Sequence, residues 1–261
     1  RENMPSADSQ NLNNVFSIFS RGVSGTGKTV ASCGKAFRPV YVFDCDQRMT
    51  SVINYYKKLD GHIRDVDFDT FAMGDHFKKL DKQMDDILAK PMYKTVVLAT
   101  LTSYIHIVLA HVLKFKAGTA KGKKIADINV NSIEDYNVED AAIIFELLGF
   151  LKALQAQGTN VILEAHLTPI EYRDLEGNTT TKLETLTKGK KAPASIPGYF
   201  DESYYFYKKH EGIIVGQGST TYHMTPHGDR QVEGKTSRGI EPIEWTNKDF
   251  SELLFNQMKG K

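Results

Sequence analysis

Residues 22–29 constrain the fold of this chain more than any other part of the sequence. They read GVSGTGKT and match the pattern G-x-x-x-x-G-K-[ST] at every fixed position. Glycines in such a loop let the backbone wrap around an anion, and a following helix directs its positive end at that anion. An apolar stretch at residues 15–19 precedes the loop. We therefore expect a strand, a phosphate-binding loop and a helix.

The residues of this phosphate loop (residues 22–29) have separate expected roles. The Lys28 amine would reach the β- and γ-phosphates of a nucleotide, and the Thr29 hydroxyl would bind Mg²⁺. Backbone N–H groups would surround the phosphates as an anion-binding nest. The remaining nucleotide-binding residues are expected to be Gly22, Ser24, Gly25, Thr26 and Gly27.

Strand and helix patterns alternate over the first 165 residues, which predicts a mostly parallel sheet with helices on both faces. A length of 261 residues allows one large domain or two small ones, and we expect one. Its core would span about 12–166, followed by a hairpin and a strand-rich C-terminal part at about 167–250. Buried strands are expected at 39–43, 95–99 and 160–165, helices at 51–59, 75–90 and 138–157, and the hairpin at 171–186.

The composition limits the partners. The charge sum of 33 − 32 = +1 excludes a globally basic nucleic-acid coat but not local basic patches. Cys33 and Cys45 have no metal-site spacing and are expected to be buried small apolar residues of a reduced, cytoplasmic protein. Residues 95–113 lack charged side chains but contain several polar ones, so we expect a strand and a core helix there and no membrane contact.

Two acidic residues follow the second predicted strand. Nucleotide hydrolysis needs a carboxylate to orient the attacking water, and the carboxyl ends of parallel strands meet at one edge of the sheet. Asp46 is the first candidate for this catalytic role and Asp44 the second. The alternative is a solvated turn with two acids.

The expected metal-side acid is missing. The strand at 95–99 continues as VVLATLT, which matches a Walker B strand except that Ala99 occupies the acidic position. Either Ala99 replaces a natural Asp, or the natural protein lacks this acid and hydrolyses slowly or not at all. Glu164, on the strand at 160–165, is a weaker candidate to replace it. His166, at the end of that strand, would sense a γ-phosphate, unless it is an ordinary core or surface histidine.

Together these residues resemble the RecA-like branch of P-loop ATPases, and most closely phage-encoded, AAA-type nucleotide-binding proteins of single-strand annealing and recombination. The resemblance rests on the phosphate loop, on VFDCD at 42–46 and on a tail pattern within 162–238, and covers roughly 15–245. It implies a RecA-like α/β fold, ATP and Mg²⁺ as ligands, and a head-to-tail ring or filament in the cytoplasm of a bacterial host. In such families a Lys/Arg pair reaches a neighbour's γ-phosphate, and Lys235 and Arg238 match it. The alternative is that Lys235 and Arg238 are ordinary surface cations on a turn.

Two basic clusters are candidates for contacting single-stranded DNA. Flexible basic loops follow a phosphate backbone, and aromatic side chains between them stack on bases. The alternative is two solvated loops. The candidates are Lys116, Lys121, Lys123 and Lys124 in the first cluster, and Tyr172, Arg173, Lys188, Lys190 and Lys191 in the second.

We therefore expect an ATPase dependent on single-stranded DNA that oligomerises and acts in annealing, recombination or replication, with a single-strand DNA-binding protein as a further candidate partner. A hexameric helicase or packaging-type motor is one alternative. A nucleotide-gated DNA-binding module without turnover is another, and Ala99 favours it. No base-reading motif separates ATP from GTP.

Overall fold

The computed structural model describes residues 15–72, 76–119, 133–173, 177, 179–187, 195–214, 217–228 and 232–259. Within these residues a ten-stranded sheet has the order β10-β8-β7-β1-β5-β4-β2-β3, with β6 paired to β5 and β9 paired to β7. The strands are β1 (Ser17–Gly22), β2 (Val40–Asp44), β3 (Val66–Thr70), β4 (Thr95–Ala99), β5 (Asn160–Arg173), β6 (Thr179–Thr185), β7 (Glu202–Ile214), β8 (Gln217–Thr225), β9 (Lys235–Thr236) and β10 (Ile243–Glu244).

The centre of the sheet is parallel. Strands β7, β1, β5, β4, β2 and β3 pair side by side in the same direction. Strands β8, β9 and β10 add antiparallel pairs from the C-terminal part of the chain. The predicted α/β class, with a mostly parallel sheet and a strand-rich C-terminal part, is confirmed.

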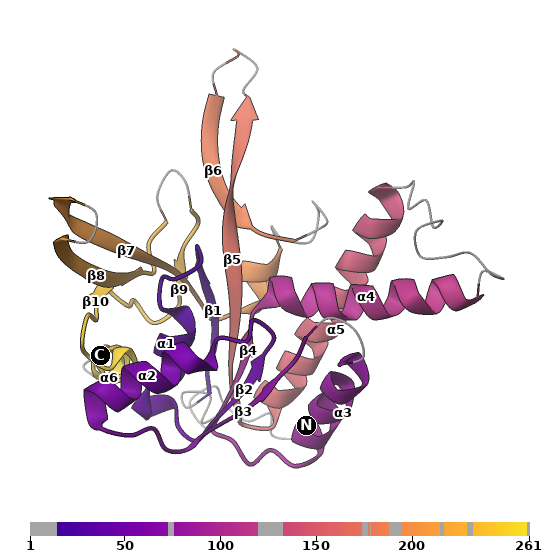
Figure 1. The fold of residues 1–261 in the computed structure, drawn as a ribbon, viewed down its shortest axis with the longest axis horizontal. Helices are drawn as coiled ribbons and strands as arrows, with labels where there is room; N and C mark the ends of the chain where they lie inside the picture. The colour runs from indigo at the N-terminus through magenta and orange to yellow at the C-terminus, as the bar shows by residue number, and fades with distance from the viewer. Residues whose placement is uncertain are drawn as a thin grey trace, which may run out of the picture.

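Helices cover both faces of this sheet, as expected (Figure 1). They are α1 (Lys28–Ser32), α2 (Met49–Asp60), α3 (Phe77–Ala89), α4 (Leu101–Thr119), α5 (Ile133–Ala156) and α6 (Phe250–Lys259). Successive side chains of a strand point to opposite faces, so each buried strand supplies two cores. Val97 and Ile162 pack with residues of α1, α2 and α6. Their neighbours Val96 and Leu163 pack with residues of α3, α4 and α5.

Two helices differ from the sequence-based assignment. The helix expected at 138–157 begins five residues earlier, at Ile133, as part of α5. Helix α6 is absent from the sequence-based assignment, although the sequence holds a start signal for it. The Asp249 carboxylate accepts hydrogen bonds from the backbone N–H of Ser251 (2.9 Å) and Glu252 (3.2 Å), as helix-capping side chains do.

The predicted hairpin is confirmed and extends away from the sheet. Beyond His166, β5 pairs antiparallel with β6, from Leu167 opposite Thr185 to Arg173 opposite Thr179. Figure 1 shows these two strands projecting from the body of the molecule. Cys33 and Cys45 are buried and unpaired. In the described part of the chain, no helix combines the length and the hydropathy that crossing a bilayer requires.

Candidate nucleotide-binding site

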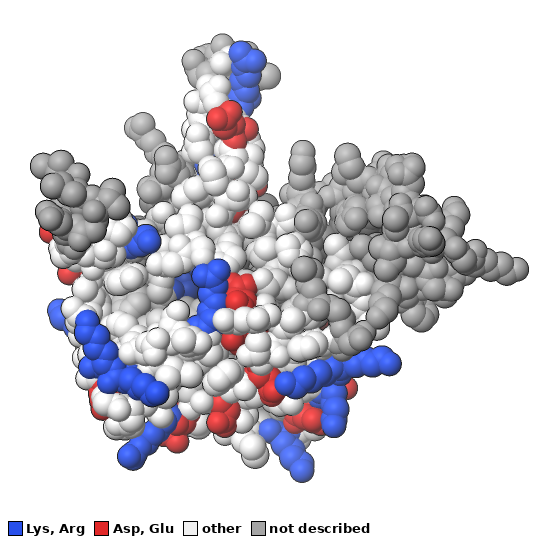
Figure 2. All heavy atoms as spheres, viewed as in Figure 1, with Lys and Arg blue, Asp and Glu red and all other residues white. Residues whose placement is uncertain are grey.

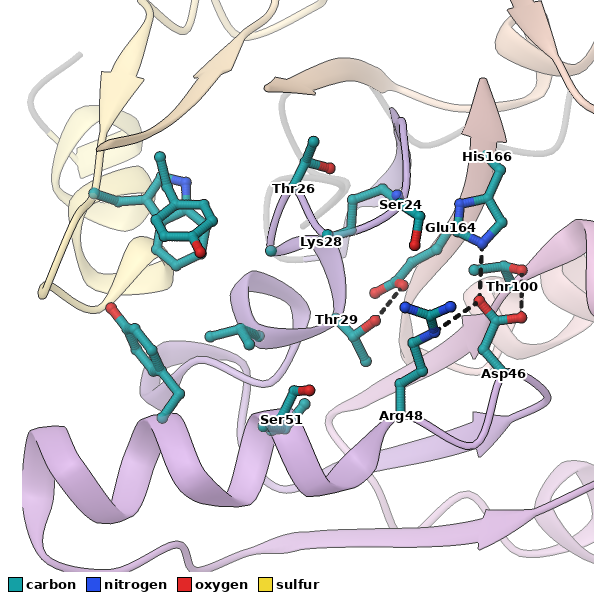
Figure 3. A pocket seen from close by; sticks show the side chains of 17 residues that line it. Ser24, Thr26, Lys28, Thr29, Asp46, Arg48, Ser51, Thr100, Glu164 and His166 are labelled. Carbon is teal, nitrogen blue, oxygen red and sulfur yellow. Dashed lines mark hydrogen bonds and ion pairs between the residues drawn. The ribbon is translucent and has the colours of Figure 1, made fainter. Parts of the chain in front are cut away.

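A cavity of about 280 Å³ lies at the carboxyl ends of β1, β2, β4 and β5. Ligands of open α/β sheets bind at this edge, because the loops that follow the strands converge there. Its wall includes most of the phosphate loop and, from other segments, Asp46, Arg48, Ser51, Val52, Tyr55, Thr100, Glu164, His166, Tyr222 and Trp245. Figure 3 shows the polar side chains of this set directed toward a common space.

The conformation of the phosphate loop explains its glycines. Gly25 and Gly27 have φ of 78° and 82°, in the left-handed region that side chains disfavour. A Cβ on Gly27 would lie 2.6 Å from two ring carbons of Trp245. The loop therefore needs glycine at position 27 for both backbone conformation and space.

Lys28 is the buried cation of the cavity, with 5 % of its surface exposed. Its ammonium donates hydrogen bonds to the carbonyl oxygens of Gly22 (2.8 Å) and Val23 (3.1 Å), so it lies against the phosphate loop itself. Burial lowers the pKa of Lys28 to about 8, although Glu164 and Asp46 act in the opposite direction. An anion in the loop would offer this ammonium a charged acceptor in place of the two carbonyls.

Glu164 contacts the residue expected to bind the metal. The Thr29 hydroxyl donates a 2.7 Å hydrogen bond to its Oε2 atom, as Figure 3 shows. The Glu164 side chain is fully buried, and its Oε1 atom has no hydrogen-bond partner among the described residues. Burial raises the pKa of Glu164, and Lys28 and the nearby hydroxyls of Thr29 and Ser32 lower it. Ala99, at the expected acidic position, is buried on the neighbouring strand β4.

Asp46 lies on the other side of the cavity, beside His166. Its carboxylate is 2.9 Å from His166 Nε2 and accepts hydrogen bonds from the hydroxyls of Thr100 (3.2 Å) and Ser103. The Arg48 Nε atom is 3.9 Å away. Burial raises the pKa of Asp46, but the hydrogen bonds from His166, Ser103 and Thr100 outweigh it and hold this pKa at about 2. Asp46 is therefore a carboxylate at neutral pH.

The second candidate, Asp44, makes different contacts. Its carboxylate accepts hydrogen bonds from the backbone N–H of Arg48 (2.9 Å) and Met49 (3.3 Å), at the start of α2. It does not line the cavity. The oxygens of Asp44 hold the N-terminus of a helix, so the structure favours Asp46 over Asp44 as the water-activating candidate, and the role of Asp44 stays a prediction.

Tyr55, Tyr222 and Trp245 form an aromatic wall that no sequence motif predicts. The ring centroids of Tyr222 and Trp245 are 5.3 Å apart, and those of Tyr55 and Trp245 are 6.0 Å apart. These rings come from α2, β8 and the segment after β10, and they line one end of the cavity. Arg48 was not predicted either. No local motif marks these residues, because they meet only in the folded chain.

Lys235 and Arg238 lie away from this chain's own phosphate loop. The Lys235 ammonium donates to the Phe200 carbonyl (2.7 Å), and the Arg238 guanidinium donates to the Val15 carbonyl (3.3 Å). Val15 precedes β1 and Phe200 precedes β7, so both contacts are at the amino ends of these strands. Within one chain the structure does not bring these two cations to the cavity.

The candidate DNA-binding residues are placed only in part. Tyr172 and Arg173 lie on β5 near the tip of the hairpin, where the Tyr172 hydroxyl donates to Glu184 and the Arg173 Nε atom donates to the Gly177 carbonyl (3.3 Å). Figure 2 shows basic and acidic side chains together on this hairpin. Lys116 belongs to α4, but its side chain lies outside the described part of the structure. The residues Lys121, Lys123, Lys124, Lys188, Lys190 and Lys191 also lie outside the described residues.

No protein-family model and no curated protein matches the sequence. Among solved structures, the chain is similar to the flagellar accessory protein FlaH from Methanocaldococcus jannaschii, with a TM-score of 0.45 and 10% identity over 88% of this chain and 84% of that chain. It is also similar to the KaiC-like protein PH0186 from Pyrococcus horikoshii, with a TM-score of 0.44 and 9% identity over 88% of this chain and 89% of that one. Both similarities are remote.

Proposed function

We propose that this protein is a RecA-like ATPase that binds ATP with Mg²⁺ at the phosphate loop. The observation that carries the proposal is the convergence of Lys28, the Thr29–Glu164 pair and Asp46 on one cavity. The residues fit the ligands. The backbone of the loop has the left-handed glycine conformation suited to an anion, and one buried oxygen of Glu164 has no hydrogen-bond partner among the residues that the structure describes. When bound, Mg²⁺ neutralises charge on the β- and γ-phosphates.

Asp46 would orient the attacking water. A carboxylate with a pKa of about 2 is a weak base, so its main contribution is to accept a hydrogen bond and fix the direction of the water. His166 bonds to Asp46 and lies on β5, which continues into the hairpin. A contact between His166 and the γ-phosphate would therefore change the position of His166 relative to both Asp46 and the hairpin.

The aromatic wall would hold the nucleobase. Tyr55, Tyr222 and Trp245 line the same cavity as the phosphate loop. Tyr55 and Tyr222 are partly exposed and offer ring faces for stacking, while the buried Trp245 packs behind them. Trp245 is the single tryptophan of the chain. Its fluorescence would report nucleotide binding without a label.

The first test is an ATP titration followed by Trp245 fluorescence, with phosphate release measured in parallel. We expect Lys28→Ala to weaken binding by roughly 100-fold, because it removes a charge-assisted hydrogen bond to phosphate worth about 2–3 kcal/mol. The matched control is Lys35→Ala, since Lys35 is a half-exposed lysine that pairs with Asp60 outside the cavity. Equal affinities of Lys28→Ala and the wild type would contradict the proposal.

We further propose that the β5–β6 hairpin and the basic clusters bind single-stranded DNA for annealing, recombination or replication. Tyr172 is 41% exposed, as a base-stacking side chain must be. We expect the Tyr172→Ala/Arg173→Ala variant to lose about 1–3 kcal/mol of DNA affinity per stacked base. The control is Lys57→Ala/Lys58→Ala, which removes two exposed lysines from α2. Unchanged affinity and unchanged salt dependence would contradict this proposal.

Self-assembly would complete the ATPase site. Lys235 and Arg238 contact the amino ends of β7 and β1, whereas their own phosphate loop follows the carboxyl end of β1. They would therefore act on a neighbouring subunit in a head-to-tail ring or filament. A mixture of Lys28→Ala and Lys235→Ala subunits tests this, since each would supply what the other lacks. We expect the mixture to hydrolyse ATP faster than either variant alone. An additive rate would exclude this role of Lys235.

Ala99 supports one alternative, a nucleotide-gated DNA-binding module without turnover. That alternative predicts ATP-dependent DNA binding with no phosphate release under any DNA condition. A helicase or packaging-type motor would in addition separate or move strands processively.

A further inference from the structure

We propose that Glu164 is the metal-side carboxylate of this site, in place of the acid that Ala99 lacks. The inference rests on the proposed nucleotide site and adds the residue that would hold its Mg²⁺. In this proposal the metal-binding acidic residue lies on strand β5 and not on the neighbouring strand β4.

The register of the sheet places the two positions side by side. Strands β4 and β5 are parallel, with Leu98 opposite Leu163, so the next residues along the two strands are Ala99 and Glu164. Neighbouring strands are about 4.8 Å apart. Ala99 packs in the same core as Ile162, which is two residues from Glu164 and therefore on its face of the sheet. A carboxylate from either position would enter the same space below the phosphate loop.

The contacts of Glu164 favour a metal ligand over a structural role. Its Oε2 atom accepts the hydrogen bond of Thr29, the hydroxyl expected on the metal. Its Oε1 atom is buried without a partner in the described part of the chain. An unpartnered carboxylate oxygen costs several kcal/mol in a protein interior, unless a ligand satisfies it. Mg²⁺ sites commonly use one or two carboxylates together with substrate phosphates.

The row of residues across the sheet also explains why position 99 is small. Asp44 lies opposite Ala99 on β2, and Glu164 lies next to it on β5. The backbones of neighbouring strands are about 5 Å apart, so an aspartate at position 99 would start about 5 Å from the backbone of Glu164. Like charges on such close neighbours repel each other. The sheet has room for one acid beside Thr29, supplied from either β4 or β5.

The test compares four proteins: the wild type, Glu164→Gln, Ala99→Asp and the exchange Ala99→Asp/Glu164→Ala. ATP affinity is measured by Trp245 fluorescence with Mg²⁺ and with EDTA, and Mn²⁺ binding is measured by electron paramagnetic resonance. We expect Mg²⁺ to raise ATP affinity at least tenfold in the wild type and to have no effect in Glu164→Gln. The exchange variant should recover most of the Mg²⁺ effect, and Ala99→Asp alone should lower the unfolding temperature.

Controls separate this inference from the proposed function. Glu171→Gln changes an exposed glutamate on the same strand, outside the cavity, and should keep the full Mg²⁺ effect. ATP binding by Glu164→Gln in EDTA at wild-type affinity shows that the variant is folded and that the phosphate loop works. A full Mg²⁺ effect in Glu164→Gln would overturn the role of Glu164 and leave the ATP site standing. Failure of the wild type to bind ATP under any condition would overturn both.

Discussion

The contact between Gly27 and Trp245 predicts a large difference between two similar substitutions in the phosphate loop. Gly25 and Gly27 are both in the left-handed region, so alanine at either position costs about 1–2 kcal/mol of backbone strain. Their surroundings differ. A Cβ on Gly25 would meet only the end of the Lys208 side chain, at 3.8 Å, whereas a Cβ on Gly27 would lie 2.6 Å from the Trp245 ring.

The Trp245 ring has little room to move. It is 1% exposed and packs against Tyr55, Tyr222 and Phe250. Overpacking a buried site typically costs a further 1–3 kcal/mol. We therefore expect Gly27→Ala to lower the free energy of unfolding by about 2–5 kcal/mol and Gly25→Ala by about 1–2 kcal/mol.

The assay is urea unfolding of the two variants and the wild type without nucleotide, followed by circular dichroism. The difference between the variants isolates the collision with Trp245, because the backbone strain is common to both. The fluorescence of Trp245 should shift to longer wavelength in Gly27→Ala only, as the ring is pushed toward water. Equal destabilisation by the two substitutions would refute the close packing of Trp245 on the loop.

Two further predictions concern pH. The low pKa of Asp46, about 2 against an ordinary value near 4, stabilises the folded state by roughly 2–3 kcal/mol at neutral pH. Because the folded pKa is the lower one, this stabilisation is present above pH 4 and is lost as the pH falls toward 2. The unfolding free energies of the wild type and Asp46→Asn should therefore differ at pH 7 and converge in acid, and a constant difference would contradict the assignment. The pKa of Lys28, about 8, predicts that ATP affinity falls above pH 8 by up to about tenfold per pH unit, as the ammonium is lost. Lys28→Arg should show no such fall, because guanidinium stays charged.

The features that the sequence predicts correctly are local ones. The phosphate loop is recognised from eight consecutive residues, and strands β2, β4 and the first half of β5 from short apolar runs. The helix expected to end at 157 ends at Ala156, just before Gly158, whose φ is 90°. Each of these depends on backbone preferences and periodicity within a few neighbouring residues.

The points that the sequence leaves open or misses have equally physical causes. Asp44 and Asp46 are separated by one residue and have the same chemistry, so the sequence cannot say which one caps α2 and which one faces the cavity. The end of β2 decides it, because the chain turns there and directs the two carboxylates to different partners. Helix α6 was not predicted because its amphipathic pattern is short. The helix is stabilised by contacts with Phe37 and the segment around Lys35, which are distant in the sequence.

The sequence alone therefore determines that this chain has a phosphate loop in a mostly parallel α/β sheet. Only the tertiary structure brings Glu164 to Thr29, 135 residues away, and Trp245 onto Gly27. Both contacts arise from which strands become neighbours and in what register, and this depends on the packing of the whole sheet. Adjacent residues form the phosphate loop, whereas the side chains that surround it, such as Glu164 and Trp245, are brought there by the tertiary structure.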